Sequence, residues 1–161
     1  MPDYREEPFD TRAAYQTAVD LVLSRASKEI CIFDPDLKAL ELDSRSRADA
    51  IGAFLAAGRD RNLRIVLHDP DYLTRYSARL SALRKRYSHC FQFRQTPEPL
   101  RGIADCFVLA DGASGAIRFH ADHFRGKLLL DRPLVIHDWQ QRFEELWIES
   151  TPCTSATQLG L

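Results

Sequence analysis

The chain has 161 residues, of which 45% are hydrophobic and 28% are charged, and these proportions are ordinary for a soluble globular protein of one domain. A formal net charge of -1 gives no overall attraction to nucleic acid or to anionic membranes. The first residues lack the basic start and apolar core of a signal peptide, and no apolar run approaches the roughly 20 residues that span a bilayer, so we expect a cytoplasmic protein without a membrane segment.

Apolar residues recur at helical and at strand spacing in alternating segments along most of the chain. In chain order, the pattern predicts helix 10–27, strand 29–33, loop 37–44, helix 45–59, strand 63–67, helix 71–87, strand 90–93, link 98–103, strand 105–110, strand 115–120 and a helix after residue 131. Residues 1–9 are polar with two prolines and are expected to be an irregular lead-in. Residues 10–150 form the predicted domain, and 151–161 a polar tail.

The first half of the chain predicts parallel strands. Asp10 or Thr11 can cap the first helix, because both side chains accept hydrogen bonds from free amides. A strand, a helix and a second strand of these lengths imply a right-handed parallel crossover. We therefore expect an α/β fold with a mixed, largely parallel sheet and helices on both faces.

Helix 71–87 combines an apolar stripe with a basic face. The residues expected to point inward are Tyr72, Tyr76, Leu80, Leu83 and Tyr87. Arg75, Arg79 and Arg86 lie on another face and form a basic patch, which could anchor phosphates or could simply be solvated. The aromatic residues belong to the inward stripe rather than to the basic face, so nucleic acid is not the partner that we expect.

The C-terminal half contains a hairpin and the most strongly patterned helix. Asp111 and Gly112 form a turn that should pair strand 105–110 with strand 115–120. After Asp131, the expected cap, and Pro133, a buried face is predicted from the residues Val135, Trp139, Phe143, Leu146 and Trp147.

The cysteines argue against a metal or a disulfide framework. Cys31, Cys90 and Cys106 lie in predicted strands, and none of the four cysteines stands at metal-finger or redox-motif spacing from another. We expect buried free thiols, no metal and no cofactor.

The segment from Ala104 to Gly112 resembles the motif strand of the phospholipase D superfamily, in which H-x-K-x(4)-D is followed by Gly. Asp111 and Gly112 match the motif, whereas Ala104 stands at the His position and Cys106 at the Lys position. In that family the His attacks phosphorus and the Lys steadies the phosphate. The resemblance therefore implies a single phospholipase D-like repeat without its catalytic pair.

Within that superfamily the chain is similar to an uncharacterised bacterial group, a domain often fused behind an acetyltransferase domain. Segments Asp34–Leu37, Phe107–Asp111 and Phe143–Trp147 carry this likeness. The resemblance implies two partners, an acetyltransferase and a second copy of the chain. We expect the homodimer contact near strands 105–110 and 115–120, where Phe107, Leu109, Ile117 and Phe119 supply apolar area.

Polar residues follow the first two predicted strands. Because ligands of open parallel sheets bind beyond the carboxyl ends of the strands, these residues are expected to share a cleft with later ones. The ligand-binding candidates are Asp34, Asp36, His68, Asp69, Asp111, Arg118, His120 and His123. Turn formation and helix capping explain the aspartates equally well.

Three functions follow from these residues. The leading interpretation is a non-catalytic binding or assembly module, with no catalytic residue. The enzyme alternative is a phosphodiesterase that uses displaced residues, His120, His123 and Lys127, although the spacing with Asp131 departs from the motif. The third is a binder of phospho-ligands or nucleic acid through the basic patch.

Overall fold

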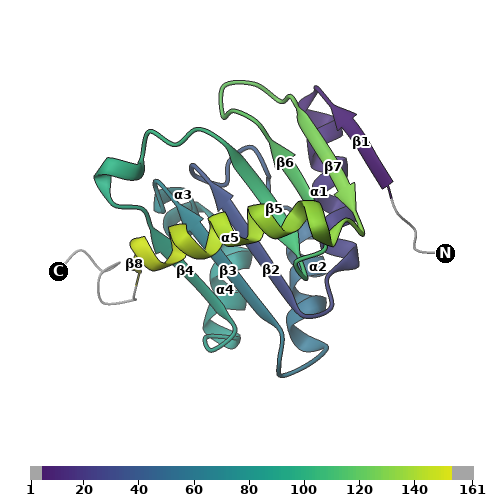
Figure 1. Ribbon diagram of the computed structural model, residues 1–161. Helices are drawn as coiled ribbons and strands as arrows, with labels where there is room; N and C mark the ends of the chain where they lie inside the picture. The colour runs from purple at the N-terminus through teal and green to yellow at the C-terminus, as the bar shows by residue number, and fades with distance from the viewer. Residues whose placement is uncertain (1–4, 154–161) are drawn as a thin grey trace.

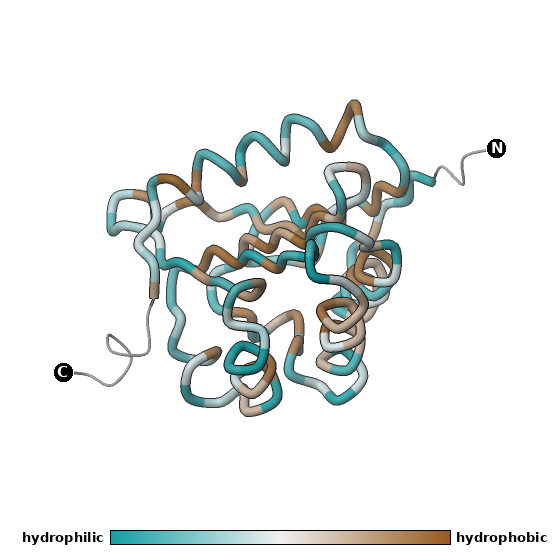
Figure 2. Tube along the Cα trace, turned by 90° about the horizontal axis from the view of Figure 1, so that it is seen from below, coloured by the Kyte–Doolittle hydropathy of each residue, from teal (hydrophilic) through white to brown (hydrophobic). Residues whose placement is uncertain are grey.

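An eight-stranded sheet organises the fold, in the order β1-β7-β6-β5-β2-β3-β4-β8 (Figure 1). The computed structural model describes residues 5–153. The strands are β1 (Arg5–Phe9), β2 (Glu29–Asp34), β3 (Asn62–Leu67), β4 (Phe91–Gln95), β5 (Cys106–Ala110), β6 (Ser114–Arg118), β7 (Gly126–Leu130) and β8 (Thr151–Pro152). Helices cover both faces of the sheet, which gives the three layers seen in Figure 2.

The helices divide unequally between the two faces of the sheet. They are α1 (Arg12–Arg25), α2 (Arg45–Ala56), α3 (Asp71–Tyr76), α4 (Ala78–Arg86) and α5 (Pro133–Glu149), with a 3-10 turn, η1, at Glu98–Leu100. Residues of α1 to α4 share one hydrophobic cluster with one face of the sheet, and α5 covers the other face (Figures 1 and 2). The expected mixed α/β fold with helices on both faces is confirmed.

The expected preponderance of parallel strands is wrong. Strands β2, β3 and β4 are parallel neighbours, and the other pairings within residues 5–153 are antiparallel. The predicted parallel crossover from β2 to β3 is present. After β4, however, the connections between β5, β6 and β7 are short, and a short turn can join only antiparallel strands.

Three strands escaped prediction. One is β8, at the start of the expected polar tail, which pairs antiparallel with β4; the rest of that tail, 154–161, lies outside the described residues. The other two, β1 and β7, pair with each other. Residues 5–9 form β1 instead of an irregular lead-in, and β1 pairs antiparallel with β7. Pro8 is tolerated because β1 lies at an edge of the described sheet, where one side of the strand needs no partner. A Cβ at Gly126 would lie 1.9 Å from the Ile117 carbonyl oxygen, so this tight start of β7 requires glycine.

The predicted helix 71–87 is broken into α3 and α4. The break is at Ser77, whose buried hydroxyl donates to the Tyr72 carbonyl oxygen at 2.9 Å. This break interrupts the predicted stripe of inward-pointing residues, and Tyr76 is exposed rather than buried.

The helix ends confirm one expected cap and contradict the other. The Thr11 hydroxyl accepts from the Ala14 amide at 3.1 Å and caps α1. Asp131 does not cap α5; the cap position is Arg132, and the Asp131 carboxylate pairs with Arg25 at 2.6 Å. The predicted buried face of α5 is confirmed by Phe143, Leu146 and Trp147.

Candidate functional site

Four polar side chains from distant parts of the chain meet inside the molecule at one end of the sheet. The carboxyl end of β2 lies beside the start of β5, since Phe33 pairs with Phe107, and the start of β5 lies beside the end of β6. This register brings together Asp34, Cys106 and Arg118, and α1 adds Tyr15. All four are buried, and we call them the polar cluster.

Asp34 is the buried carboxylate of the polar cluster. One oxygen, Oδ2, accepts hydrogen bonds from the Leu37 amide at 2.7 Å and the Asp36 amide at 3.2 Å. The other, Oδ1, is buried without a hydrogen-bond partner among residues 5–153. Burial raises the pKa of Asp34 to about 6, because removal from water disfavours the charged form more than these two amides favour it.

We compare the free energy of unfolding of the variant Asp34→Asn with that of the wild type. The difference should favour the variant by about 1–3 kcal/mol more at pH 7 than at pH 4. The folded state keeps the Asp34 proton up to about pH 6, whereas an unfolded chain loses it near pH 3.8. The folded state therefore binds more protons in this window, and its stability falls as the pH rises through it. Asparagine has no such proton to lose.

Urea unfolding of both proteins from pH 4 to pH 7 measures this difference, and other titrating groups cancel in the comparison. A difference in unfolding free energy that stays constant over this range would mean that Asp34 ionises freely in the folded protein.

Cys106 and Ala104 stand where the phospholipase D motif, which this segment resembles, has Lys and His. Burial raises the pKa of the Cys106 thiol to about 12, and the nearby Asp34 carboxylate adds to this effect. The Ala104 carbonyl oxygen accepts from the Ala121 amide at 2.7 Å, which ties the start of β5 to the loop after β6. A thiol that keeps its proton at neutral pH is a poor nucleophile.

Arg118 holds the loop between β6 and β7 in place. Its Nε donates to the His123 carbonyl oxygen at 2.7 Å, and a second guanidinium nitrogen donates to the Ala121 carbonyl oxygen. The guanidinium lies over the Phe124 ring, 4.2 Å from its centre. These hydrogen bonds occupy two of the five guanidinium N–H donors within the protein.

The other ligand-binding candidates that follow β2 and β3 make hydrogen bonds within the protein, and these bonds give each of them a structural role. The His68 Nε2 lies 2.8 Å from the Ile103 carbonyl oxygen, and Nδ1 lies 2.7 Å from the Thr96 hydroxyl. Because a carbonyl oxygen only accepts, Nε2 is the nitrogen that carries the proton in the neutral ring. Asp36 and Asp69 accept from backbone amides two residues further on, as turn-forming aspartates do.

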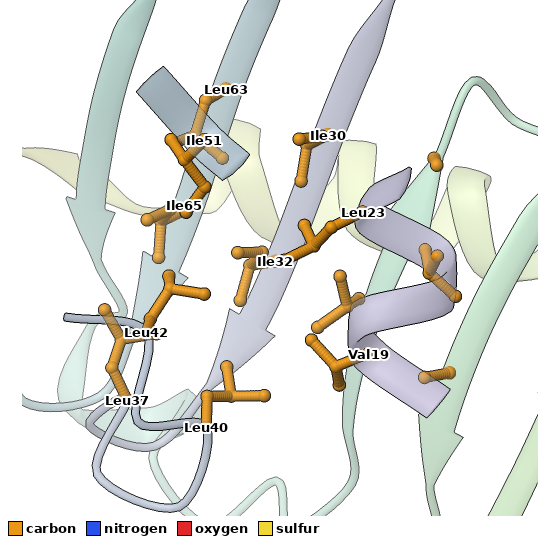
Figure 3. Packing of buried hydrophobic residues seen from close by; sticks show 14 of the residues in the cluster. Val19, Leu23, Ile30, Ile32, Leu37, Leu40, Leu42, Ile51, Leu63 and Ile65 are labelled. Atoms are coloured by element: carbon orange, nitrogen blue, oxygen red, sulfur yellow. The ribbon is translucent and has the colours of Figure 1, made fainter. Parts of the chain in front are cut away.

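Leucine side chains of the β2–α2 loop fill the same end of the sheet. Leu37, Leu40 and Leu42 are fully buried and lie beside Ile32 and Ile65 (Figure 3). The sequence predicted this loop but not its burial. The apolar spacing within residues 37–42 was the available signal. Buried leucines therefore pack at the carboxyl ends of β2 and β3, and we call Leu37, Leu40 and Leu42 the leucine plug.

Asp111 lies at the opposite end of the sheet, so the expectation that it shares a cleft with Asp34 is wrong. Antiparallel pairing of β5 with β2 places the end of β5 beside the start of β2. The Asp111 carboxylate accepts from the amides of Ser27, Lys28 and Glu29 at 2.9, 2.7 and 3.0 Å. The motif aspartate thus holds the beginning of β2.

His120 and His123 lie close together, with ring centres 5.7 Å apart, in the loop after β6. Each Nδ1 accepts from the backbone amide two residues further on, at 3.0 and 3.2 Å. Lys127 pairs with Glu6 on β1, and Asp131 pairs with Arg25, so the four do not form one site. Within residues 5–153, no three His, Cys, Asp or Glu side chains gather to hold a metal ion.

The basic patch divides between the two helices that replace helix 71–87. Arg75 on α3 pairs with Asp71 at 3.2 Å. Arg79 and Arg86 on α4 line a groove between α4 and α2, together with Arg45 of α2. Sequence reasoning missed Arg45. Its spacing from Ala48, Gly52 and Ala56 on one face of α2 was the only available signal.

No helix in residues 5–153 has the length and apolar character needed to cross a bilayer.

Solved structures with the same fold share little sequence with this chain. TrmBL2, described as an archaeal chromatin protein with a novel mode of DNA binding, aligns at a TM-score of 0.68 and 15% identity over 92% of this chain and 54% of its own. Nuc from Salmonella typhimurium, a phospholipase D family member, aligns at 0.59 and 12% over 94% of this chain and 100% of its own. NucT from Helicobacter pylori gives 0.64 and 12% with the same coverages.

These likenesses show a phospholipase D-like fold and nothing finer, and the chain spans about half the length of the TrmBL2 chain. No curated protein matches the sequence. A family model described as a domain of unknown function, DUF7931, matches residues 10–159, and the chain therefore belongs to the DUF7931 family.

Proposed function

We propose that this domain is a non-catalytic phospholipase D-like module that binds a partner or helps to assemble a complex. The observation that carries the proposal is the chemistry of the motif strand. Ala104 offers no nucleophile, and Cys106 is a buried thiol whose pKa is raised to about 12. Neither side chain can attack phosphorus or neutralise a phosphate at neutral pH.

The surroundings of the motif strand support the same interpretation. Arg118 donates to two loop carbonyl oxygens, and both ring nitrogens of His68 lie within hydrogen-bond distance of protein oxygens. The leucine plug of residues 37–42 fills the space beyond β2 and β3. The hydrogen bonds of Arg118 and His68 occupy polar groups that could otherwise bind a phosphodiester.

We expect no hydrolysis of a chromogenic phosphodiester by the purified protein, because the nucleophile and the phosphate clamp are missing. The comparison is with buffer alone and with the variants His120→Ala and His123→Ala. Turnover above buffer that either replacement abolishes would establish the displaced-histidine phosphodiesterase instead.

A homodimer and an acetyltransferase partner belong to the proposal as well. The apolar surface that motivated the dimer is largely absent: Phe107, Leu109 and Ile117 are buried within one chain, and Phe119 is exposed. Strands β5 and β6 lie beneath α5, which covers this area. Of these four residues, Phe119 alone remains available for a contact between two copies.

Light scattering at micromolar concentration tests the dimer, which the family resemblance predicts. We expect a mass of twice 18.4 kDa, and a mass of 18.4 kDa would remove the dimer from the proposal. Adding a separately purified acetyltransferase domain in the same measurement tests the second partner, since a complex would raise the mass further.

A further inference from the structure

A groove of about 680 Å³ runs between α2 and α4 on the helical face of the molecule. Residues of one face of each helix line it, at spacings of three and four: from α2 these are Arg45, Ala48, Asp49, Gly52, Ala53 and Ala56, and from α4 and its end Arg79, Ala82, Leu83, Arg86 and Tyr87. From residue 45 to residue 56 the groove is about 17 Å long, at 1.5 Å per residue of helix.

Five of the eleven lining residues are small, and we call them the floor of the groove: Ala48, Gly52, Ala53, Ala56 and Ala82. The side chains of Ala53, Ala56 and Ala82 are exposed, although each is a single methyl group. A Cβ at Gly52 would lie 3.2 Å from a methyl group of Leu83, so α2 and α4 approach closely below the floor. A floor of methyl groups allows another backbone to approach closely and offers little for hydrogen bonding.

The rim of the groove is positive, and its positive groups lack acidic partners. Within residues 5–153, no carboxylate lies within ion-pair distance of Arg45, Arg79 or Arg86. Arg79 has only a long contact, 3.4 Å, to the Asp43 carbonyl oxygen. Asp49 is the single acidic residue of the lining. Although the chain has a net charge of -1, three arginines without a carboxylate partner in the described part of the chain therefore lie along one groove.

We propose that this groove binds an acidic amphipathic helix of a partner protein. The helix lays an apolar face on the methyl floor, and glutamates or aspartates on its flanks reach Arg45, Arg79 and Arg86. The length of the groove accommodates about three turns of helix, or about eleven residues. The inference rests on the proposed binding function and assigns that function a surface and a class of partner.

The floor distinguishes this partner from a nucleic acid. Single-stranded nucleic acids bind through aromatic side chains on which bases stack, and duplexes through rows of phosphate contacts. Here the one aromatic residue in the lining, Tyr87, is half-buried and lies 5.6 Å from the Arg86 guanidinium. The methyl groups of the floor would meet phosphates without any hydrogen-bond donor.

The test uses a fluorescent, hydrocarbon-stapled peptide of about 14 residues, with Leu and Ala on one face and Glu on both flanks. We expect saturable binding that weakens as salt increases, because the ion pairs are exposed. In an NMR spectrum of the alanine methyl groups, the signals of Ala53, Ala56 and Ala82 should shift when the peptide is added. Ala13, which is exposed on α1, should not.

Charge reversal identifies the rim. The double variant Arg79→Glu and Arg86→Glu should weaken peptide binding at least about tenfold. The matched control, Arg12→Glu with Arg125→Glu, makes the same change in net charge at exposed positions outside the groove and should leave the affinity within about twofold. Circular dichroism checks that each variant is folded.

Three results would overturn the proposal. The first is that the peptide shows no saturable binding, and the second is that the control pair weakens binding as much as the rim variant does. The third is that a 12-base-pair duplex binds more tightly than the peptide and that the double variant Arg79→Glu and Arg86→Glu abolishes this binding. The last would make nucleic acid the occupant. None of these results bears on diester hydrolysis, so the failure of the groove and the failure of the non-catalytic proposal are separate outcomes.

Discussion

Replacing Phe143 by alanine should lower the free energy of unfolding by about 3–5 kcal/mol. The ring is fully buried where α5 crosses the sheet. It lies 6.0 Å from the Trp147 ring and 6.5 Å from the Phe107 ring, and the Arg64 guanidinium lies 5.1 Å from its centre. Alanine would leave a cavity among large rings and would remove part of the apolar cover of Arg64.

Urea unfolding monitored by tryptophan fluorescence measures this loss. Leu134→Ala is the matched control, because Leu134 lies on the same helix and is 91% exposed. The control should change the stability by less than about 0.5 kcal/mol. If the two variants had the same urea midpoint as the wild type, α5 would not be packed as described.

Replacing Asp111 by alanine should cost about 2–4 kcal/mol, although the side chain is only half-buried. Its carboxylate accepts from three successive backbone amides at the start of β2, which would then lack partners in the protein. Its backbone also has a positive φ of 57°, a conformation that aspartate and asparagine adopt more easily than alanine does.

Asp111→Asn separates these contributions, because it keeps the backbone preference and one accepting oxygen. Its loss should be clearly smaller than that of Asp111→Ala. Asp122→Ala, at an exposed loop position, should have almost no effect. Equal stability of Asp111→Ala and the wild type would show that the carboxylate does not hold β2, and a functional explanation for the motif aspartate would then be needed.

The sequence by itself determined those helices and strands whose buried residues recur at a regular helical or strand spacing. Helix α5 and strands β2, β3 and β5 could be predicted because a helical or strand period is a local property of the chain. The crossover rule also placed Asp34 and His68 at the same end of the sheet. Their role in ligand binding stays a prediction.

Only the tertiary structure decided which side chains meet. Strands β1 and β7 are short, and β1 contains charged residues and a proline. β1 is held by its pairing with β7, and β7 by its pairing with both β1 and β6. Asp111 belongs with residues 27–29 rather than with Asp34 because β5 runs antiparallel to β2, and strand direction does not follow from periodicity. The groove likewise needs Arg45 of α2 beside Arg79 and Arg86 of α4. These arrangements depend on packing between distant segments, for which a single sequence carries no local pattern.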